Sequence, residues 1–173
     1  MTKDLSPWFT QFQQDQNRKY SYEESKEKWK KLVSHEISAG NANLQLIIQN
    51  FNSDINCKGW DFSNVDLTLL GNSRYINNFS GCTFKSLTIK SNSQEPRATI
   101  NNIDFSGATF QEDVYINAQI DGSLNLTKSS FLSSNATLDI VISNSPTWGR
   151  CESNYLKKPE SNSLPVQNLK EFR

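Results

Sequence analysis

Large apolar residues recur every five positions in the centre of the chain, and this spacing constrains the fold more than any other feature. A period of five fits neither the 3.6-residue turn of an α-helix nor the two-residue repeat of a strand. It therefore indicates a repeat architecture. The large residues in this register are Phe62 and Leu67; Phe79, Phe84 and Ile89; and Ile100, Phe105, Phe110, Tyr115 and Ile120.

A second buried-type residue precedes most of the large ones by two positions, as Cys82 precedes Phe84 and Ala108 precedes Phe110. The residue between the two is polar, for example Thr83. If each five-residue unit turns the chain by about a right angle, four units close a square coil. Successive coils then stack at the strand spacing of about 4.8 Å. Both apolar positions face one narrow interior, and the polar residue points outward.

Residues 60–67, 79–84 and 102–110 carry the repeat most clearly. They resemble the pentapeptide-repeat family, whose motif is alanine, aspartate or asparagine, leucine or phenylalanine, and two variable residues. The resemblance covers about half of the chain and implies a right-handed quadrilateral β-helix. We therefore expect a mainly β fold, with a β-helix of about four coils and an N-terminal helical cap.

Two departures from the repeat are visible. Residues 91–97 form a polar insertion, which we expect to bulge out as a loop. After Ile120 the register slips, because the expected centre falls on Asn125 between Leu124 and Leu126. Ordinary strand alternation, as at Val114 and Ile116, predicts wider faces in these later coils.

The first 40 residues are predicted to be helical. Ser6 followed by Pro7 is typical of a helix start. Ser21 with Glu24 forms a capping box at a second start, and that helix should end near Gly40. The run 44–48 is ambiguous between helix and strand.

The expected organisation has three parts: a helical cap over residues 1–56, the β-helix over 57–145, and a C-terminal cap with an extended tail over 146–173. A solenoid needs caps because its end coils leave strand edges unpaired. The N-terminal aromatic residues should cover the first coil, with Trp60 at the junction. Pro146 and Trp148 are candidates for closing the last coil.

Composition gives little sign of catalysis or of a charged partner. Lysine and arginine total 18 and so do aspartate and glutamate, so the net charge is zero. No apolar run or basic leader suggests a membrane span or secretion, and we expect a cytoplasmic protein. The chain has one histidine, His35, and three dispersed cysteines, so we expect no catalytic residues, no metal site and no cofactor.

The resemblance implies one role, since some pentapeptide-repeat proteins imitate duplex DNA and occupy the DNA site of type II topoisomerases. Residues 54–140 hold nine acidic and six basic side chains, which is weak mimicry against one charge per about 1.7 Å of DNA. We expect a binding protein that inhibits or shields a macromolecular complex. It could inhibit a DNA-handling enzyme by partial DNA mimicry, or a host complex as a phage-like anti-defence inhibitor does. It should contact neither nucleic acid nor membrane directly. The candidate partner-binding residues, each of which could instead be a solvated corner, are Asp61, Asp66, Asp104 and Asp139.

A structural or adaptor protein is the alternative. Its contact would be the aromatic stripe of Trp8, Phe9 and Phe12, or Trp29, and it could form a homodimer. Packing of these rings against the first coil is the simpler interpretation of the same residues.

Overall fold

The computed structural model describes residues 2–50 and 53–142, and the structural statements that follow concern those residues. The expected closure by Pro146 and Trp148, the extended tail and Cys151 lie outside this range.

Two helices open the chain after a short strand, β1 (Lys3–Asp4): α1 (Ser6–Gln16) and α2 (Tyr22–Ser38). The predicted capping box of α2 is confirmed. The Ser21 side chain accepts the backbone N–H of Glu24 at 3.4 Å, and the Glu24 carboxylate accepts the Ser21 N–H at 2.8 Å. Gly40 follows α2 with a φ of +87°, a left-handed conformation that glycine adopts at little cost.

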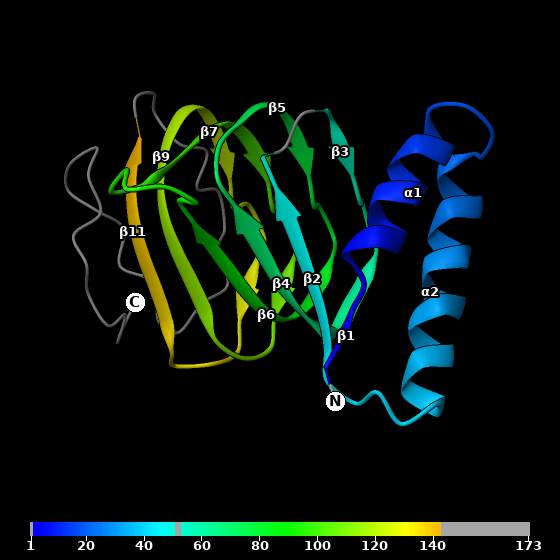
Figure 1. Ribbon diagram of the computed structural model, residues 1–173. Coiled ribbons are helices and arrows are strands. Elements are labelled where there is room, and N and C mark those ends of the chain that lie inside the picture. The colour runs from blue at the N-terminus through cyan, green and yellow to red at the C-terminus, as the bar shows by residue number, and fades with distance from the viewer. Residues whose placement is uncertain (1, 51–52, 143–173) are drawn as a thin grey trace.

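The remaining strands wind into a parallel β-solenoid of about four coils, as predicted. Figure 1 shows the coils stacked side by side, with α1 and α2 at one end and β11 at the other. The strands are β2 (Leu44–Gln49), β3 (Ile55–Asn56), β4 (Asp61–Leu70), β5 (Ser73–Asn78), β6 (Thr83–Lys90), β7 (Ala98–Asp104), β8 (Thr109–Phe110), β9 (Val114–Asn125), β10 (Ser130–Phe131) and β11 (Ala136–Ile142).

The pairing register defines the coil. One coil is 20 to 22 residues in most places: Leu44 pairs with Val65, and Ala98 pairs with Ala118. It lengthens to 27 residues between Ser73 and Ile100 because the polar insertion 91–97 lies within that coil. This insertion is a loop between β6 and β7, as predicted.

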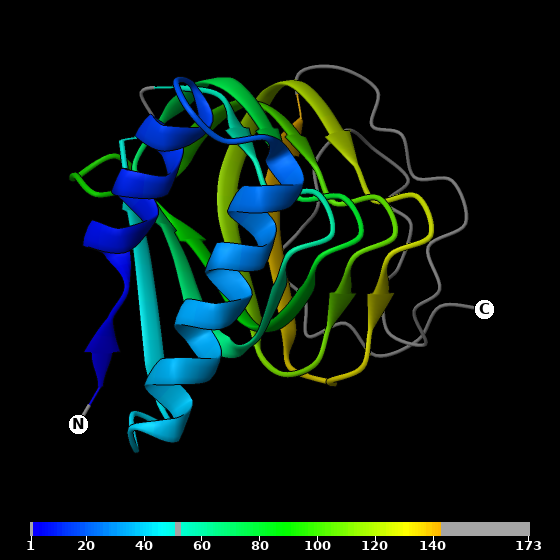
Figure 2. The same cartoon turned by 90° about the vertical axis from the view of Figure 1, so that its right-hand side faces the viewer.

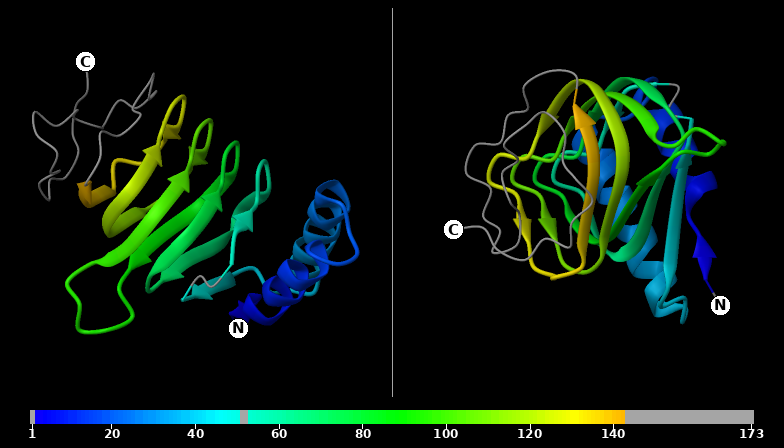
Figure 3. Two further views of the ribbon diagram at one scale, coloured as in Figure 1. Left: turned by 90° about the horizontal axis from the view of Figure 1, so that it is seen from above. Right: turned by 90° about the vertical axis from the view of Figure 1, so that its left-hand side faces the viewer.

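The interior is a set of stacked side chains. One phenylalanine from each of four coils forms a continuous column, with ring centroids 5.6, 5.1 and 4.5 Å apart in the order Phe62, Phe84, Phe110 and Phe131. Figure 3 shows the successive coils that these rings join. Stacked rings of this kind bury a large apolar area, so the column is a major source of stability.

The helices cover the first coil with aromatic side chains. The ring of Trp29 stacks on Trp60 at 5.6 Å, and Phe9 meets both indoles edge-on at about 6 Å. All three side chains are buried, and the Trp29 indole N–H donates to the carbonyl of Asp61 at 3.3 Å. The two helices lie against the end of the coil stack in Figure 2. Because Trp60 contacts the rings of Phe9 and Trp29, it marks the junction as predicted.

The structure corrects one member of the five-residue series. Tyr115 points outward and is 41% exposed, whereas Val114 and Ile116 point inward. The register advances by one residue between Phe110 and Val114, because Phe84 pairs with Phe110 but Leu87 pairs with Val114. The slip after Ile120 is confirmed: Leu124 and Leu126 are buried on either side of Asn125.

The solenoid begins at Leu44, ahead of the boundary expected at Cys57. The run 44–48 is a strand whose alternate side chains Leu44, Leu46 and Ile48 are buried. It pairs with β4 on one side and β1 on the other. The five-residue period does not reach this segment, so it predicts no register there.

Candidate binding surface

The outward side chains of β4, β6, β9 and β11 form one face of the solenoid, and a depression of about 560 Å³ lies at the edge of this face. It arises because the corners that lead into the face differ in length. From Phe62 to Asp66 the chain advances four residues, but the paired stretch from Phe84 to Ser86 advances only two. The short corner at Ser86 is therefore recessed between longer neighbours.

The depression is lined by carboxylates, hydroxyls and one amide. We call it the acidic depression. Its side chains come from four coils that are far apart in sequence and adjacent in space: Asp66, Ser86, Thr88, Glu112, Asp113, Tyr115, Asn135 and Thr137. Carboxylates and neutral hydrogen-bonding groups together suit a cationic or polar partner surface.

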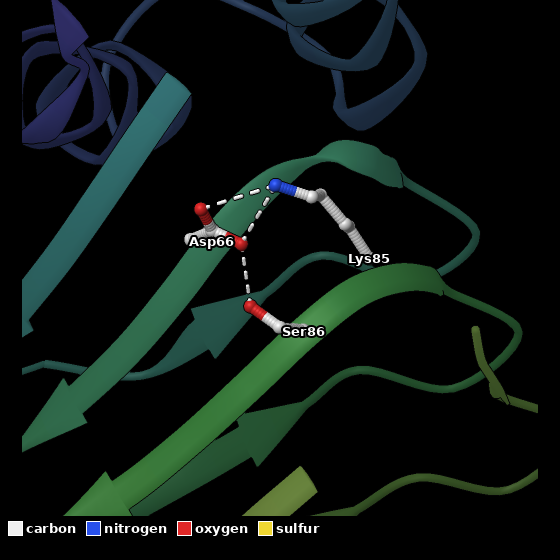
Figure 4. A network of polar contacts seen from close by, with 3 residues as sticks. All are labelled: Asp66, Lys85 and Ser86. Atoms are coloured by element: carbon white, nitrogen blue, oxygen red, sulfur yellow. Dashed lines mark hydrogen bonds and ion pairs between the residues drawn. The ribbon is translucent and has the colours of Figure 1, made fainter. Parts of the chain in front are cut away.

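Asp66 is held in a small network at this site (Figure 4). The Lys85 ammonium lies 3.2 Å from the carboxylate, and the Ser86 hydroxyl donates to it at 2.6 Å. The Asp66 side chain is 43% exposed, and an ion pair this accessible contributes less than about 1 kcal/mol to stability. Lys85 nevertheless neutralises much of the charge that Asp66 presents to solvent.

Glu112 and Asp113 are both exposed. Asp113 accepts a hydrogen bond from the Asn135 amide at 3.1 Å, and its backbone carbonyl accepts the N–H of Leu87. Three ion pairs occur within residues 2–50 and 53–142, and neither Glu112 nor Asp113 belongs to them. These two carboxylates therefore give the acidic depression its charge.

The other three predicted residues lie outside the acidic depression. Asp61 begins β4 beneath the helical cap and accepts the N–H of Ser63 at 2.9 Å. Asp104 ends β7 and accepts the N–H of Ser106 at 2.8 Å. Asp139 on β11 pairs with Arg97 at 2.7 Å. The structure thus does not gather the four candidates into one site, and only Asp66 lines the acidic depression.

Asp104 belongs to a column of turn-capping residues that borders a second, more open depression. In four successive coils, the last residue of strand β3, β5, β7 or β9 accepts the backbone N–H of the residue two positions later. These residues are Asn56, Asn78, Asp104 and Asn125. Such side-chain caps stabilise the tight turn that follows. The carboxylate of Asp104 therefore has a structural task that asparagine performs equally well in the other coils.

The thiols are not placed for chemistry. Cys57 and Cys82 are buried beneath the cap, where the Cys82 thiol donates to the carbonyl of Cys57. Burial raises the pKa of Cys82 to about 12 and that of Cys57 well above its usual range, so both stay protonated at neutral pH. His35 lies on the exposed side of α2. Among residues 2–50 and 53–142, no group of three metal-binding side chains converges.

The aromatic stripe of the first helix is divided. Phe9 and Trp29 are buried in the cap, whereas Trp8 is 48% exposed. Packing against the first coil, the simpler interpretation, therefore holds for Phe9 and Trp29.

Comparisons with protein-family models, with curated proteins and with solved structures find no match. In the part of the chain that the structure describes, no helix has the length and apolar character needed to cross a membrane.

Glu112 and Asp113 are neighbouring carboxylates in the sequence, and no sequence pattern places them in a site. Their convergence with Asp66 depends on the unequal corner lengths, which appear only once the strand register is known. Tyr115 was assigned to the interior for the same reason. The signal available in the sequence was the alternation of Val114 and Ile116 around it.

Proposed function

We propose that this protein is a member of the pentapeptide-repeat family and acts without catalysis, by binding a macromolecular partner through the outside of its solenoid. The observation that carries the proposal is the filled interior, in which stacked rings and aliphatic side chains occupy the axis of every coil. A ligand can approach only the exterior, as on other solenoids that use extended outer surfaces.

The acidic depression is the favoured contact within this proposal. Glu112 and Asp113 are exposed and outside the described ion pairs, and Asp66 lies beside them. A partner with a basic surface would gain complementary charge there, which increases association rate and orientation more than it increases affinity. A DNA-handling enzyme or complex has such a surface, so inhibition by partial DNA mimicry is the specific form we propose, in the cytoplasm.

The mimicry is partial because part of the acidic charge is compensated. Lys85 neutralises Asp66, and Arg97 neutralises Asp139. Duplex DNA presents one charge per about 1.7 Å, and the coils repeat every 4.8 Å or so. One uncompensated carboxylate for each coil would therefore fall short of DNA by about threefold, which favours a local charged contact over imitation of the whole duplex.

The test measures DNA supercoiling by a type II topoisomerase, and binding to that enzyme, with and without the protein. We expect inhibition that excess DNA reverses. The double variant Glu112→Gln/Asp113→Asn should weaken it severalfold, because it removes the two exposed charges. Asp104→Asn is the matched control, since asparagine already caps the equivalent turns at Asn78 and Asn125. No effect on supercoiling, together with no partner that DNA displaces, would contradict inhibition by DNA mimicry.

A structural or adaptor role is the second candidate, and the exposure of Trp8 is the observation that favours it. A self-association surface on α1 would bury this indole. Sedimentation of the full chain and of Trp8→Ser tests the self-association: a dimer that Trp8→Ser converts to monomer supports it, and a monomer at all concentrations refutes it.

A further inference from the structure

One outward row of side chains changes type at a single coil. Thr68 on β4 pairs with Thr88 on β6. Thr88 pairs in turn with Tyr115 on β9, which pairs with Thr137 on β11. Figure 1 shows β6, β9 and β11 side by side. Threonine thus fills this position in three coils, and an aromatic ring replaces it in the coil between β6 and β11.

The Tyr115 ring is accessible to a partner. Tyr115 is 41% exposed, and its neighbours on the two adjacent strands are the short side chains of Thr88 and Thr137. The Asn117 amide donates a hydrogen bond to the Tyr115 hydroxyl at 3.4 Å, which holds the ring along β9. The face of an aromatic ring carries partial negative charge and attracts a cation within about 6 Å of its centroid. A ring held in this open position therefore offers a cation-binding face.

Two carboxylates lie just before this ring in the chain and line the same depression, Glu112 and Asp113. Both are exposed, and neither belongs to an ion pair within residues 2–50 and 53–142. Asp113 is two residues from Tyr115, so the two side chains leave the chain on the same side, about 7 Å apart. Because an ion pair spans up to about 4 Å, one cation can contact the ring and a carboxylate together.

We propose that the acidic depression takes an arginine side chain of the partner protein, with the guanidinium stacked on the Tyr115 ring and paired with Asp113 or Glu112. This contact rests on the proposed function and specifies the group that the partner inserts. Arginine fits better than lysine, because a planar guanidinium stacks on a ring and pairs with a carboxylate through two N–H groups. Arginine is also a side chain that recognises phosphate in nucleic acids, so a partial DNA mimic would compete for it.

The carboxylates and the ring have separate tasks in this contact. Glu112 and Asp113 attract any cation, because Coulomb attraction does not distinguish an ammonium from a guanidinium. The Tyr115 ring distinguishes them, since an ammonium is more strongly hydrated and gains less from stacking. A cation–π contact at an exposed site corresponds to about two- to fivefold in affinity. Tyr115 is therefore the specificity-determining residue of the depression.

Chemical-shift titrations of the full chain test the preference for arginine. The probes are N-acetyl-arginine amide and N-acetyl-lysine amide, which carry the same charge at neutral pH. We expect saturable shifts of the Asp113 and Tyr115 backbone amides with both probes, and an affinity about two- to fivefold higher for the arginine probe. Equal affinities, or no saturable shift with either probe, would overturn the arginine contact.

Two substitutions separate the ring of Tyr115 from its hydroxyl. Tyr115→Phe keeps the aromatic face and should keep the preference for arginine. Tyr115→Leu removes the face and should bring the two probes to equal affinity, because only the carboxylates then attract them. A preference that survives in Tyr115→Leu would show that the ring does not bind the guanidinium.

The supercoiling assay separates this contact from the proposed function. We expect Tyr115→Leu to weaken inhibition of the topoisomerase by about two- to fivefold, and Tyr115→Phe to retain most of it. Inhibition by the wild type that Tyr115→Leu retains in full would overturn the arginine contact and leave the function standing. A preference for the arginine probe without any inhibition would contradict DNA mimicry and support the contact.

Discussion

Two columns of side chains that run along the same coils follow different rules. The inward column repeats one residue type, as Phe62, Phe84, Phe110 and Phe131. The outward column that joins β2, β4 and β6 changes at every step, from Gln45 to Asp66 to Ser86. An inward side chain must fill the same narrow space in each coil, whereas an outward one meets solvent and its local neighbours. The fold is therefore encoded by repetition, and specific contacts are encoded by departures from it.

The largest expected effect comes from breaking the inward column. Phe84→Ala removes a ring that stacks on both Phe62 and Phe110 and is fully buried. We expect a loss of about 3 to 5 kcal/mol in the free energy of unfolding, from lost transfer energy and the cavity that remains. Urea denaturation followed by circular dichroism measures it. The control is Tyr115→Ala on the outward face, and an equal loss in both variants would contradict the distinction between the columns.

The same distinction explains how much of the structure the sequence predicts. The solenoid, its four coils and the insertion 91–97 follow from the five-residue period, because every interior position repeats. The helical cap follows from local signals, such as the capping box of Ser21 and Glu24. Each of these features depends on residues close together in the sequence or on a fixed period.

The five-residue period does not predict the acidic depression. It requires the two-residue difference between the corner ending at Asp66 and the corner ending at Ser86, and the extra residue before Val114. Corners point outward, so no packing rule fixes their length, and the period does not reveal it. The interior assignment of Tyr115 was wrong for that reason, and the candidates Asp61 and Asp104 carry turn-capping hydrogen bonds.

A second prediction concerns the buried thiol of Cys82, whose pKa is raised to about 12 by burial. Between pH 9 and 12 the unfolded chain ionises this thiol while the folded chain keeps its proton. The unfolded state then binds fewer protons, so stability falls as pH rises through this window and is unaffected below it. The loss should approach 1 kcal/mol or so per pH unit.

Cys82→Ala isolates this contribution from other alkaline titrations, and alanine already occupies the equivalent position in the next coil, at Ala108. We expect the unfolding free energy of the wild type to fall more steeply than that of the variant above pH 9. Parallel curves from pH 8 to 11 would show that the thiol ionises equally in both states.

The stacked turns form a column in which glycine repeats in three coils and is replaced in the fourth. Gly59, Gly81 and Gly107 occupy the left-handed position of three stacked turns, with φ between 65° and 69°, and Lys128 takes that position in the fourth with φ of 58°. Because a side chain costs about 1 kcal/mol in this conformation, Lys128→Gly should stabilise the protein by up to that amount. Gly81→Ala should destabilise it by about 1 to 2 kcal/mol. Thermal unfolding compares the two, and opposite signs are the essential result.

The smallest expected change in stability comes from a substitution in the outward column. Asp66→Asn removes the charge that Lys85 faces, while its amide oxygen can still accept the Ser86 hydroxyl. We expect a loss below about 1 kcal/mol, since exposed ion pairs contribute little.

Lys85→Met removes the other partner and leaves the carboxylate uncompensated beside Glu112 and Asp113. Under the proposed function, Lys85→Met should strengthen binding to a basic partner and make it more salt-sensitive, because screening acts on the added field. Titration at two salt concentrations measures both quantities, and weaker binding by Lys85→Met would show that the partner does not respond to negative charge at this depression.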